Sequence, residues 1–220
     1  MEIIPKLILV LITFCAVGLS STTAQQVDLS EFEGMQIRAI GPAGMSGRVT
    51  SIDALINNPE TIYIGTASGG LWKTVSGGIE WEPLFDKQPT QSIGAVAIDP
   101  TNPDVIWAGT GEGNPRNSHN SGMGIFKSLD GGKTWKALGL EETKTIHRII
   151  INPKNPDIVH VAAVGSAWGP NEDRGVFRTL DGGQNWEKVL YINEKTGCAD
   201  LVVDPRNPDK LIAAMWEYGR

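Results

Sequence analysis

The most informative stretch of this 220-residue chain is Ser128-Leu129-Asp130-Gly131-Gly132-Lys133-Thr134-Trp135. It returns at residues 179–186 as TLDGGQNW, and a degenerate copy, TVSGGIEW, precedes both at residues 74–81. The tryptophans that end the three copies are 54 and 51 residues apart. A period in this range is typical of β-propellers and related arrays, so it predicts one supersecondary unit per copy.

The repeated stretch has the chemistry of a tight turn followed by a strand. Glycine adopts positive φ without steric cost, so Asp-Gly-Gly favours a turn. The aspartate carboxylate and the hydroxyl two residues before it can accept hydrogen bonds from backbone N–H groups of the same turn. The tryptophan then begins the next strand, where its ring can bury against a neighbouring sheet. We therefore predict structural roles for six residues: Ser128, Asp130, Trp135, Thr179, Asp181 and Trp186.

The pattern Ser-x-Asp-x-Gly-x-Thr-Trp is similar to the Asp-box, or BNR repeat, of sialidases, some xyloglucanases, sortilin-type receptors and photosystem assembly factors. Residues 128–135 fit every defined position, residues 179–186 have Thr for Ser and Asn for Thr, and Ser76 replaces the aspartate of the first copy. With its long loops and the lead-in IRAIGP at residues 37–42, the chain most resembles secreted bacterial propellers of the sortilin-like group. Many of these are labelled glycosyl hydrolase by analogy. The resemblance runs from about Arg48 to the C-terminus; it implies a propeller and leaves the function open.

The repeat predicts an all-β chain made of four-stranded antiparallel blades. Apolar first strands are expected at residues 49–55, 93–98, 146–151 and 201–203, each followed by an Asn-Pro turn and a second strand. The expected blades are about 47–87, 92–139 and 145–191, with 198–220 as half of a fourth. Because propellers close with at least four blades, we expect a piece of a larger propeller, with the remaining blades supplied by a longer chain. Residues 25–46 are read as a lead-in that holds a possible closing strand.

Residues 1–24 have the pattern of a signal peptide, with Lys6 before an apolar run and Thr22-Thr23-Ala24 as the cleavage site. We therefore expect a secreted or periplasmic protein with no transmembrane segment in its mature part. Only Cys198 remains after cleavage, so neither an intrachain disulfide nor a cysteine zinc site is expected. The three histidines have no metal-ligand spacing, and no cofactor or metal is predicted. The net charge of −6 without a basic stripe argues against nucleic acid as a partner.

Two long loops mark the expected working face. In an up-and-down blade, the loops after the second and fourth strands share one face, and the Asp-Gly-Gly turns lie on the other. The loop after the second strand is short in the first copy but spans residues 110–124 in the second and 163–175 in the third. Insertions on one face of a repeat protein commonly serve binding. The candidate ligand-binding residues, including two arginines from first strands, are Arg48, Asn114, Arg116, His119, Arg148, Trp168, Asn171 and Arg174.

Two functions of different classes fit these residues. The first is a binding module that presents this face to a peptide, protein or glycan. The alternative is a glycoside hydrolase of the xyloglucanase-like type, for which Glu112 and Glu172 are the candidate acid and base. Two carboxylates facing one groove favour hydrolysis, whereas carboxylates engaged by arginines favour binding. The first strands of the blades are expected to line the central channel of the propeller. At its mouth we expect a cluster that either binds a ligand or joins the blades as a network, made of Arg48, His147, Arg148 and Asp200. Sialidase activity is not expected, because residues 38–42 depart from the Arg-Ile-Pro motif of that family.

Overall fold

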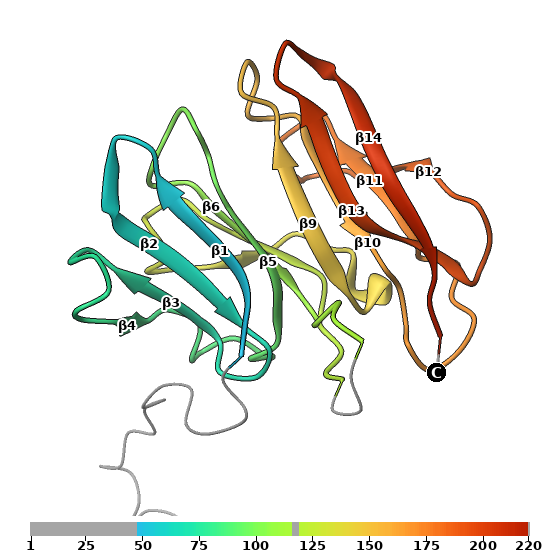
Figure 1. The fold of residues 1–220 in the computed structure, drawn as a ribbon, viewed down its shortest axis with the longest axis horizontal. Helices are drawn as coiled ribbons and strands as arrows, with labels where there is room; N and C mark the ends of the chain where they lie inside the picture. The colour runs from blue at the N-terminus through green and yellow to red at the C-terminus, as the bar shows by residue number, and fades with distance from the viewer. Residues whose placement is uncertain (1–47, 116–118, 220) are drawn as a thin grey trace, which may run out of the picture. The chain divides into compact units, whose positions relative to one another are not determined.

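The computed structural model describes residues 48–115 and 119–219, all of which belong to one compact unit of the chain. The expected signal peptide and lead-in lie outside the described residues, as does Arg116. Over the described residues the chain forms three four-stranded sheets and one two-stranded sheet, all antiparallel (Figure 1). Glu141–Thr143 adds a short 3₁₀ helix.

The sheets follow the repeat in the sequence. The first comprises β1 (Val49–Leu55), β2 (Asn58–Thr66), β3 (Leu71–Thr74) and β4 (Glu82–Pro83). The second comprises β5 (Ile93–Ile98), β6 (Ile106–Thr110), β7 (Ile125–Ser128) and β8 (Lys136–Ala137). The third comprises β9 (Ile146–Ile151), β10 (Val159–Ala163), β11 (Gly175–Thr179) and β12 (Glu187–Leu190). The fourth comprises β13 (Thr196–Asp204) and β14 (Asn207–Glu217).

Each complete sheet is a meander, in which neighbouring strands follow one another along the chain. The first strands β1, β5, β9 and β13 contact one another in this order, so each sheet faces the next. The predicted four-stranded antiparallel sheets are confirmed, and β1, β5 and β9 begin and end at the predicted residues. The hairpin of β13 and β14 is longer than predicted, because its pairing extends to Thr196 and Glu217.

The core lies between the sheets. One cluster joins the first two sheets through Phe85, Ile93 and Phe126, and another joins the second and third through Trp107, Ile146 and Val161. The first strands of the second and third sheets each approach a glycine of the preceding sheet closely. A Cβ atom on Gly65 would lie 2.4 Å from Ile93 Cγ2, and one on Gly109 would lie 2.3 Å from Ile146 Cγ2. Side chains at these positions would force the sheets apart.

The repeated turns have the predicted hydrogen bonds. Asp130 accepts from the Thr134 backbone N–H at 2.8 Å and from the Thr134 hydroxyl at 2.6 Å, and the Ser128 hydroxyl accepts from the Gly132 N–H at 2.8 Å. The hydrogen bond from Thr134 holds the pKa of the Asp130 carboxyl at about 2. Asp181 makes the equivalent contacts with Asn185, and its pKa is also lowered. Both glycines of each turn have positive φ, as Asp-Gly-Gly requires.

The degenerate first copy keeps the turn, but a serine replaces the aspartate as the hydrogen-bond acceptor within it. Ser76, which replaces the aspartate, accepts a hydrogen bond from the Glu80 N–H at 2.9 Å. A single hydroxyl takes the place of two carboxylate oxygens, so this turn has fewer bonds within it. The Trp81 indole donates to Gly78 of its own turn, whereas the later tryptophans donate to the preceding sheet.

Candidate functional site

The loops that follow the second and fourth strands lie together at one end of the sheets. A backbone hydrogen bond of the same kind joins them in all four sheets, running from the residue just after the second strand to the residue before the first. The four bonds are Ala67 N to Arg48 O at 3.1 Å, Gly111 N to Ser92 O at 2.8 Å, Val164 N to Thr145 O at 3.1 Å, and Tyr218 N to Lys195 O at 3.0 Å. We call this end the loop face. It carries the candidate ligand-binding residues that lie within the described chain.

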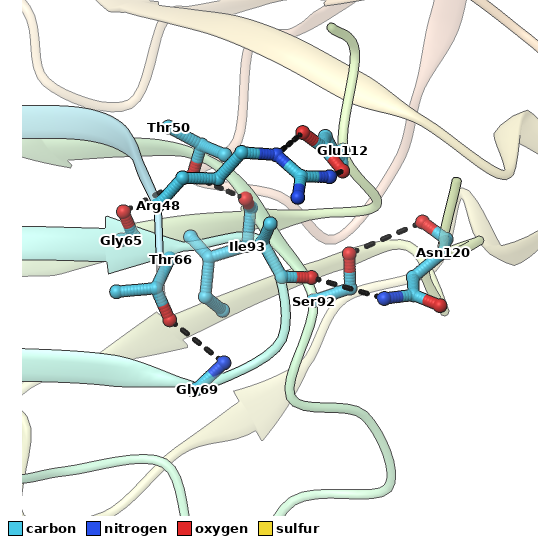
Figure 2. Close-up of polar contacts among 10 residues, drawn as sticks. Arg48, Thr50, Gly65, Thr66, Gly69, Ser92, Ile93, Glu112 and Asn120 are labelled. Atoms are coloured by element: carbon cyan, nitrogen blue, oxygen red, sulfur yellow. Dashed lines mark hydrogen bonds and ion pairs between the residues drawn. The ribbon is translucent and has the colours of Figure 1, made fainter. Parts of the chain in front are cut away.

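Arg48 and Glu112 form an ion pair between the first two sheets at this face (Figure 2). Arg48 precedes β1 and Glu112 follows β6, so residues 64 positions apart meet. The Arg48 Nε donates to one carboxylate oxygen at 2.6 Å, and Nη2 donates to the other. The Glu112 side chain is 0% exposed and that of Arg48 is 22% exposed. A fork-like pair of this kind is among the stronger side-chain contacts and leaves the carboxylate little capacity for another role.

A small polar pocket of about 290 Å³ lies beside this pair. It is lined by Ser68, Thr90, Gln91, Ser92, His119, Asn120 and Ser121, which come from three loops of the first two sheets. The Ser92 hydroxyl donates to Asn120 O at 3.1 Å, and the Glu112 N–H donates to the same carbonyl at 3.1 Å. The Asn120 side-chain amide also donates to Ala67 O at 3.5 Å, so Asn120 contacts both of the first two sheets, and Figure 2 shows its contact with Ser92. The pocket wall is therefore tied to the ion pair through the backbone.

The described residues that line this pocket offer hydroxyl groups, amides and an imidazole, and none of these described residues is an acid, a lysine or an arginine. Such groups donate and accept hydrogen bonds without a fixed charge. The chemistry suits a neutral, hydroxyl-rich ligand better than an anion or a cation.

A second ion pair joins the third and fourth sheets. The Arg148 Nε on β9 donates to Asp200 Oδ1 on β13 at 2.8 Å, and both side chains are about half exposed. This hydrogen bond lowers the pKa of Asp200. Burial, followed by the nearby Arg148 charge, lowers the pKa of His147, so its ring is neutral at pH 7. Gly113 lies against the His147 ring, since a Cβ there would be 2.1 Å from Nδ1.

Three of the four predicted channel-mouth residues, Arg48, Arg148 and Asp200, belong to two separate ion pairs. Arg48 bonds to Glu112 between the first and second sheets, and Arg148 bonds to Asp200 between the third and fourth sheets. Each pair joins two sheets.

Arg174 holds the long loop of the third sheet in place through hydrogen bonds to backbone carbonyls. Its side chain is almost wholly buried. Nη1 donates to the carbonyls of Val164, Lys195 and Tyr218 at 3.0, 3.2 and 2.8 Å, and Nη2 donates to those of Ser166 and Gly169 at 2.5 and 2.9 Å. A ligand contact from this guanidinium would require it to leave five carbonyl oxygens.

Trp168 lies between the two loop carbonyls that Arg174 Nη2 holds, and its side chain is 59% exposed. Asn171 donates from its side chain to Glu142 O at 3.1 Å, which ties the loop to the 3₁₀ helix. Glu172 is exposed, and its backbone carbonyl accepts from Lys188 Nζ at 2.5 Å on the outer strand β12. The two candidate glycosidase carboxylates thus lie in different settings. Glu112 is buried beside Arg48, and Glu172 is near the outer strand of the third sheet.

His119 and Asn114 belong to the long loop of the second sheet. His119 is buried, and its ring lies 5.8 Å from that of Tyr218, which follows β14. Tyr218 in turn lies 5.2 Å from Trp216. Asn114 is partly exposed. His119 therefore lines the pocket on one side and touches a residue of the fourth sheet on the other.

Several residues of this face escaped sequence reasoning. Asn120 and Tyr218 have no motif around them, and their roles depend on contacts with distant loops. The buried role of Arg174 had one signal, because Gly165 and Gly169 flank a loop that returns on itself. Both have positive φ, and a Cβ on Gly165 would lie 2.3 Å from Arg174 Cγ.

Residues 48–115 and 119–219 contain no group of three or more His, Cys, Asp or Glu side chains arranged to hold a metal ion. Within the same residues, no helix has the length and hydropathy needed to span a bilayer. Cys198 is a buried free thiol, and burial raises its pKa to about 11.

Comparison with known proteins gives relatives among glycoside hydrolases. No protein-family model matches the chain. A xyloglucanase of Paenibacillus sp is 26% identical over 162 residues, which cover 67% of this chain and 15% of the relative. An oligoxyloglucan-reducing end-specific xyloglucanase of Emericella nidulans is 27% identical over 178 residues, which cover 73% of this chain and 20% of the relative. The chain thus spans a fifth or less of the length of these curated relatives.

Solved structures give the same fold. The crystal structure of an ancestral GH74 enzyme matches with a TM-score of 0.63 and 22% identity, covering 78% of this chain and 22% of that one. This likeness, together with the meander sheets, confirms the predicted all-β class with β-propeller blades. The described residues form blades of a β-propeller.

Proposed function

We propose that the loop face of these blades binds a neutral glycan and does not itself cleave it. The observation that carries this proposal is the pairing of carboxylates with arginines. Glu112 is held by Arg48 and Asp200 by Arg148, so each carboxylate already has a cationic partner. A glycosidase needs one carboxylic acid that gives a proton and a second carboxylate that acts as base or nucleophile. An ion-paired, fully buried carboxylate is poorly suited to either role.

The ligand class follows from the pocket beside the ion pair. The side chains of its described lining residues can exchange hydrogen bonds with sugar hydroxyls and carry no fixed charge. The two curated relatives are named as xyloglucanases, which supports a neutral glycan over a peptide. Trp168, exposed at the tip of the neighbouring loop, would add a flat surface for a sugar ring.

The test is to fill the pocket and measure binding. Ser121→Trp places a large side chain at the exposed edge of the pocket, and Lys133→Trp places the same side chain at an exposed position of a turn in the second sheet. Calorimetric titration with xyloglucan-derived oligosaccharides should show binding to the unaltered protein and to Lys133→Trp, with loss in Ser121→Trp. Equal binding by the three proteins would reject this pocket as the site.

Hydrolysis is the second candidate, favoured by the names of the curated relatives. It requires Glu112 and Glu172, or one of them with another carboxylate, to meet a glycosidic bond. Release of reducing ends from xyloglucan would be measured for the unaltered protein, Glu112→Gln and Glu172→Gln. Turnover that Glu172→Gln abolishes while the thermal midpoint stays unchanged would establish hydrolysis and overturn the binding proposal.

Export to the periplasm or the outside of the cell remains part of the proposal. It rests on the signal-peptide pattern of residues 1–24. N-terminal sequencing of protein recovered outside the cytoplasm should begin at Gln25.

A further inference from the structure

His147 on β9 lies against the base of the loop that supplies one wall of the polar pocket. That loop follows β6 and begins with Gly111, Glu112 and Gly113. A Cβ atom on Gly113 would lie 2.1 Å from His147 Nδ1 and 2.6 Å from its Cγ, so the imidazole ring packs directly on the Gly113 backbone. A side chain at position 113 would displace the ring. A strand of the third sheet thus supports a loop of the second sheet through His147.

The Nδ1 atom of His147 is suited to the neutral form of the ring. It is buried and has no hydrogen-bond partner among the described residues. In a neutral imidazole one nitrogen carries a proton and the other a lone pair, whereas in the charged form both nitrogens carry protons. A lone pair at Nδ1 can face the Gly113 backbone. A proton there would add a buried donor at a contact too close to admit an acceptor, and such a donor is costly.

The charges around the ring do not offset this cost. Burial is the largest cause of the lowered His147 pKa, and the charge of the neighbouring Arg148 lowers this pKa further. The carboxylates of Asp200 on β13 and of Glu112 in the loop act in the opposite direction. Both carboxylates already have arginine partners, Arg148 and Arg48. The contact between ring and loop therefore favours a neutral histidine.

The base of the loop is bonded to the pocket wall. The Glu112 N–H donates to Asn120 O at 3.1 Å, and the hydroxyl of Ser92 donates to the same carbonyl at 3.1 Å (Figure 2). Further along the loop, the Gly122 N–H donates to Lys144 O at 2.7 Å, two residues before β9. Asn120 and Ser92 both line the pocket. A movement of Glu112 away from β9 would therefore also move the pocket wall.

We propose that His147 makes glycan binding at this pocket sensitive to acid, because its protonation releases Glu112 and Gly113 from β9 and displaces Asn120. The inference rests on the proposed function, since it concerns the same pocket. The proton is taken up at Nδ1, and the charged ring leaves Gly113 for water, where its charge is hydrated. The pocket is intact while the ring is neutral and loses its wall when the ring is charged.

The direction of the pH effect follows from the two states of the loop. The His147 pKa is below 6.5 while the ring packs on Gly113, and it returns to about 6.5 once the ring is in water. The released state therefore binds the proton more tightly, so acid favours release. Between pH 7.5 and pH 5 the equilibrium constant for release should rise by up to about thirtyfold, a limit set by the pKa of the solvated ring.

Amide hydrogen exchange measured by NMR tests the release without a ligand. In the unaltered protein, the protection factors of the Glu112 and Gly122 amides, corrected for intrinsic exchange rates, should fall by about five- to thirtyfold from pH 7.5 to pH 5. They should stay constant in His147→Phe and His147→Gln, whose side chains do not titrate. The Leu84 amide, which donates to Leu71 O in the first sheet, is the internal control and should not change.

Glycan titration at the two pH values tests the link to binding. The affinity of the unaltered protein for xyloglucan-derived oligosaccharides should be lower at pH 5, with the same loss in His160→Gln, a histidine control on β10, and no loss in the two His147 variants. If no protein binds glycan at either pH, the proposed function fails, and the exchange measurements still decide whether His147 releases the loop. Equal protection at both pH values, equal affinity at both in a protein that binds, or a loss that persists without His147 overturns the inference.

Discussion

The contribution of the Arg48–Glu112 pair is directly testable by a double-mutant cycle. Arg48→Ala leaves a carboxylate that is 0% exposed without its cation. Removing one partner of a buried pair costs about 3–5 kcal/mol, because the remaining charge stays buried and uncompensated. Glu112→Gln leaves the guanidinium, which is 22% exposed and can turn toward water, so its expected cost is only about 1–3 kcal/mol.

The two single variants should therefore differ, with Arg48→Ala the less stable. The double variant, Arg48→Ala with Glu112→Gln, should lose less unfolding free energy than the two single variants lose together, because no buried charge then remains. Urea unfolding followed by tryptophan fluorescence measures the free energies, and calorimetry should show midpoint shifts of about 2–4 °C per kcal/mol. Equal losses from the two single changes, or strict additivity, would refute the assignment of Glu112 as a buried, arginine-held carboxylate.

Three further outcomes are expected. Asp130→Ala should lower the thermal midpoint at pH 7 and leave glycan affinity intact. Because the pKa of Asp130 in the folded protein is lowered to about 2, the difference in thermal midpoint between the variant and the unaltered protein should shrink as the pH falls from 4 toward 2. A difference in midpoint that does not change with pH would contradict this. Arg174→Ala should destabilise the protein by roughly 2–4 kcal/mol and speed amide hydrogen exchange in residues 164–173, because five carbonyls lose a buried donor; unchanged exchange would show that the loop is held by other contacts. Cys198 should resist a thiol reagent at pH 8 and react in urea, because burial raises its pKa to about 11; rapid native labelling, followed on the Cys198 peptide, would show an accessible thiol.

The fold could be predicted from local chemistry because each blade repeats the same short-range signals. Apolar first strands, Asn-Pro turns and Asp-Gly-Gly turns each act within a few residues, so β1, β5 and β9 were placed at their true bounds. The hydrogen bonds within the turns could also be predicted, because Asp130 and Thr134 are only four residues apart. The fourth sheet was predicted less well. The length of a hairpin depends on cross-strand pairing that continues to Thr196 and Glu217, and no local signal marks that end.

The loop face was less predictable because its contacts join distant residues. The sequence indicated which loops are long and which residues in them can bind, but not which of those residues the fold uses for itself. Arg174 looked like a ligand contact and is enclosed by five carbonyls, three of them outside positions 165–173. Glu112 looked like a free acid and meets an arginine from another sheet. The assignment of Glu112 and Glu172 as acid and base stays a prediction.

The two ends of the sheets are stabilised by different chemistry, which bears on where function can change. At the turn end, glycine carbonyls and indole N–H groups join neighbouring sheets through Gly131, Gly182, Trp135 and Trp186. Each of these bonds runs from a side-chain donor to a backbone carbonyl, so the packing of the turns depends on the side chains at these positions. At the loop face, the bonds shared by all four sheets run between backbone groups, which places little demand on loop sequence or length. The loops after β6 and β10 can therefore lengthen and acquire a pocket or an exposed tryptophan while the turns keep the sheets together.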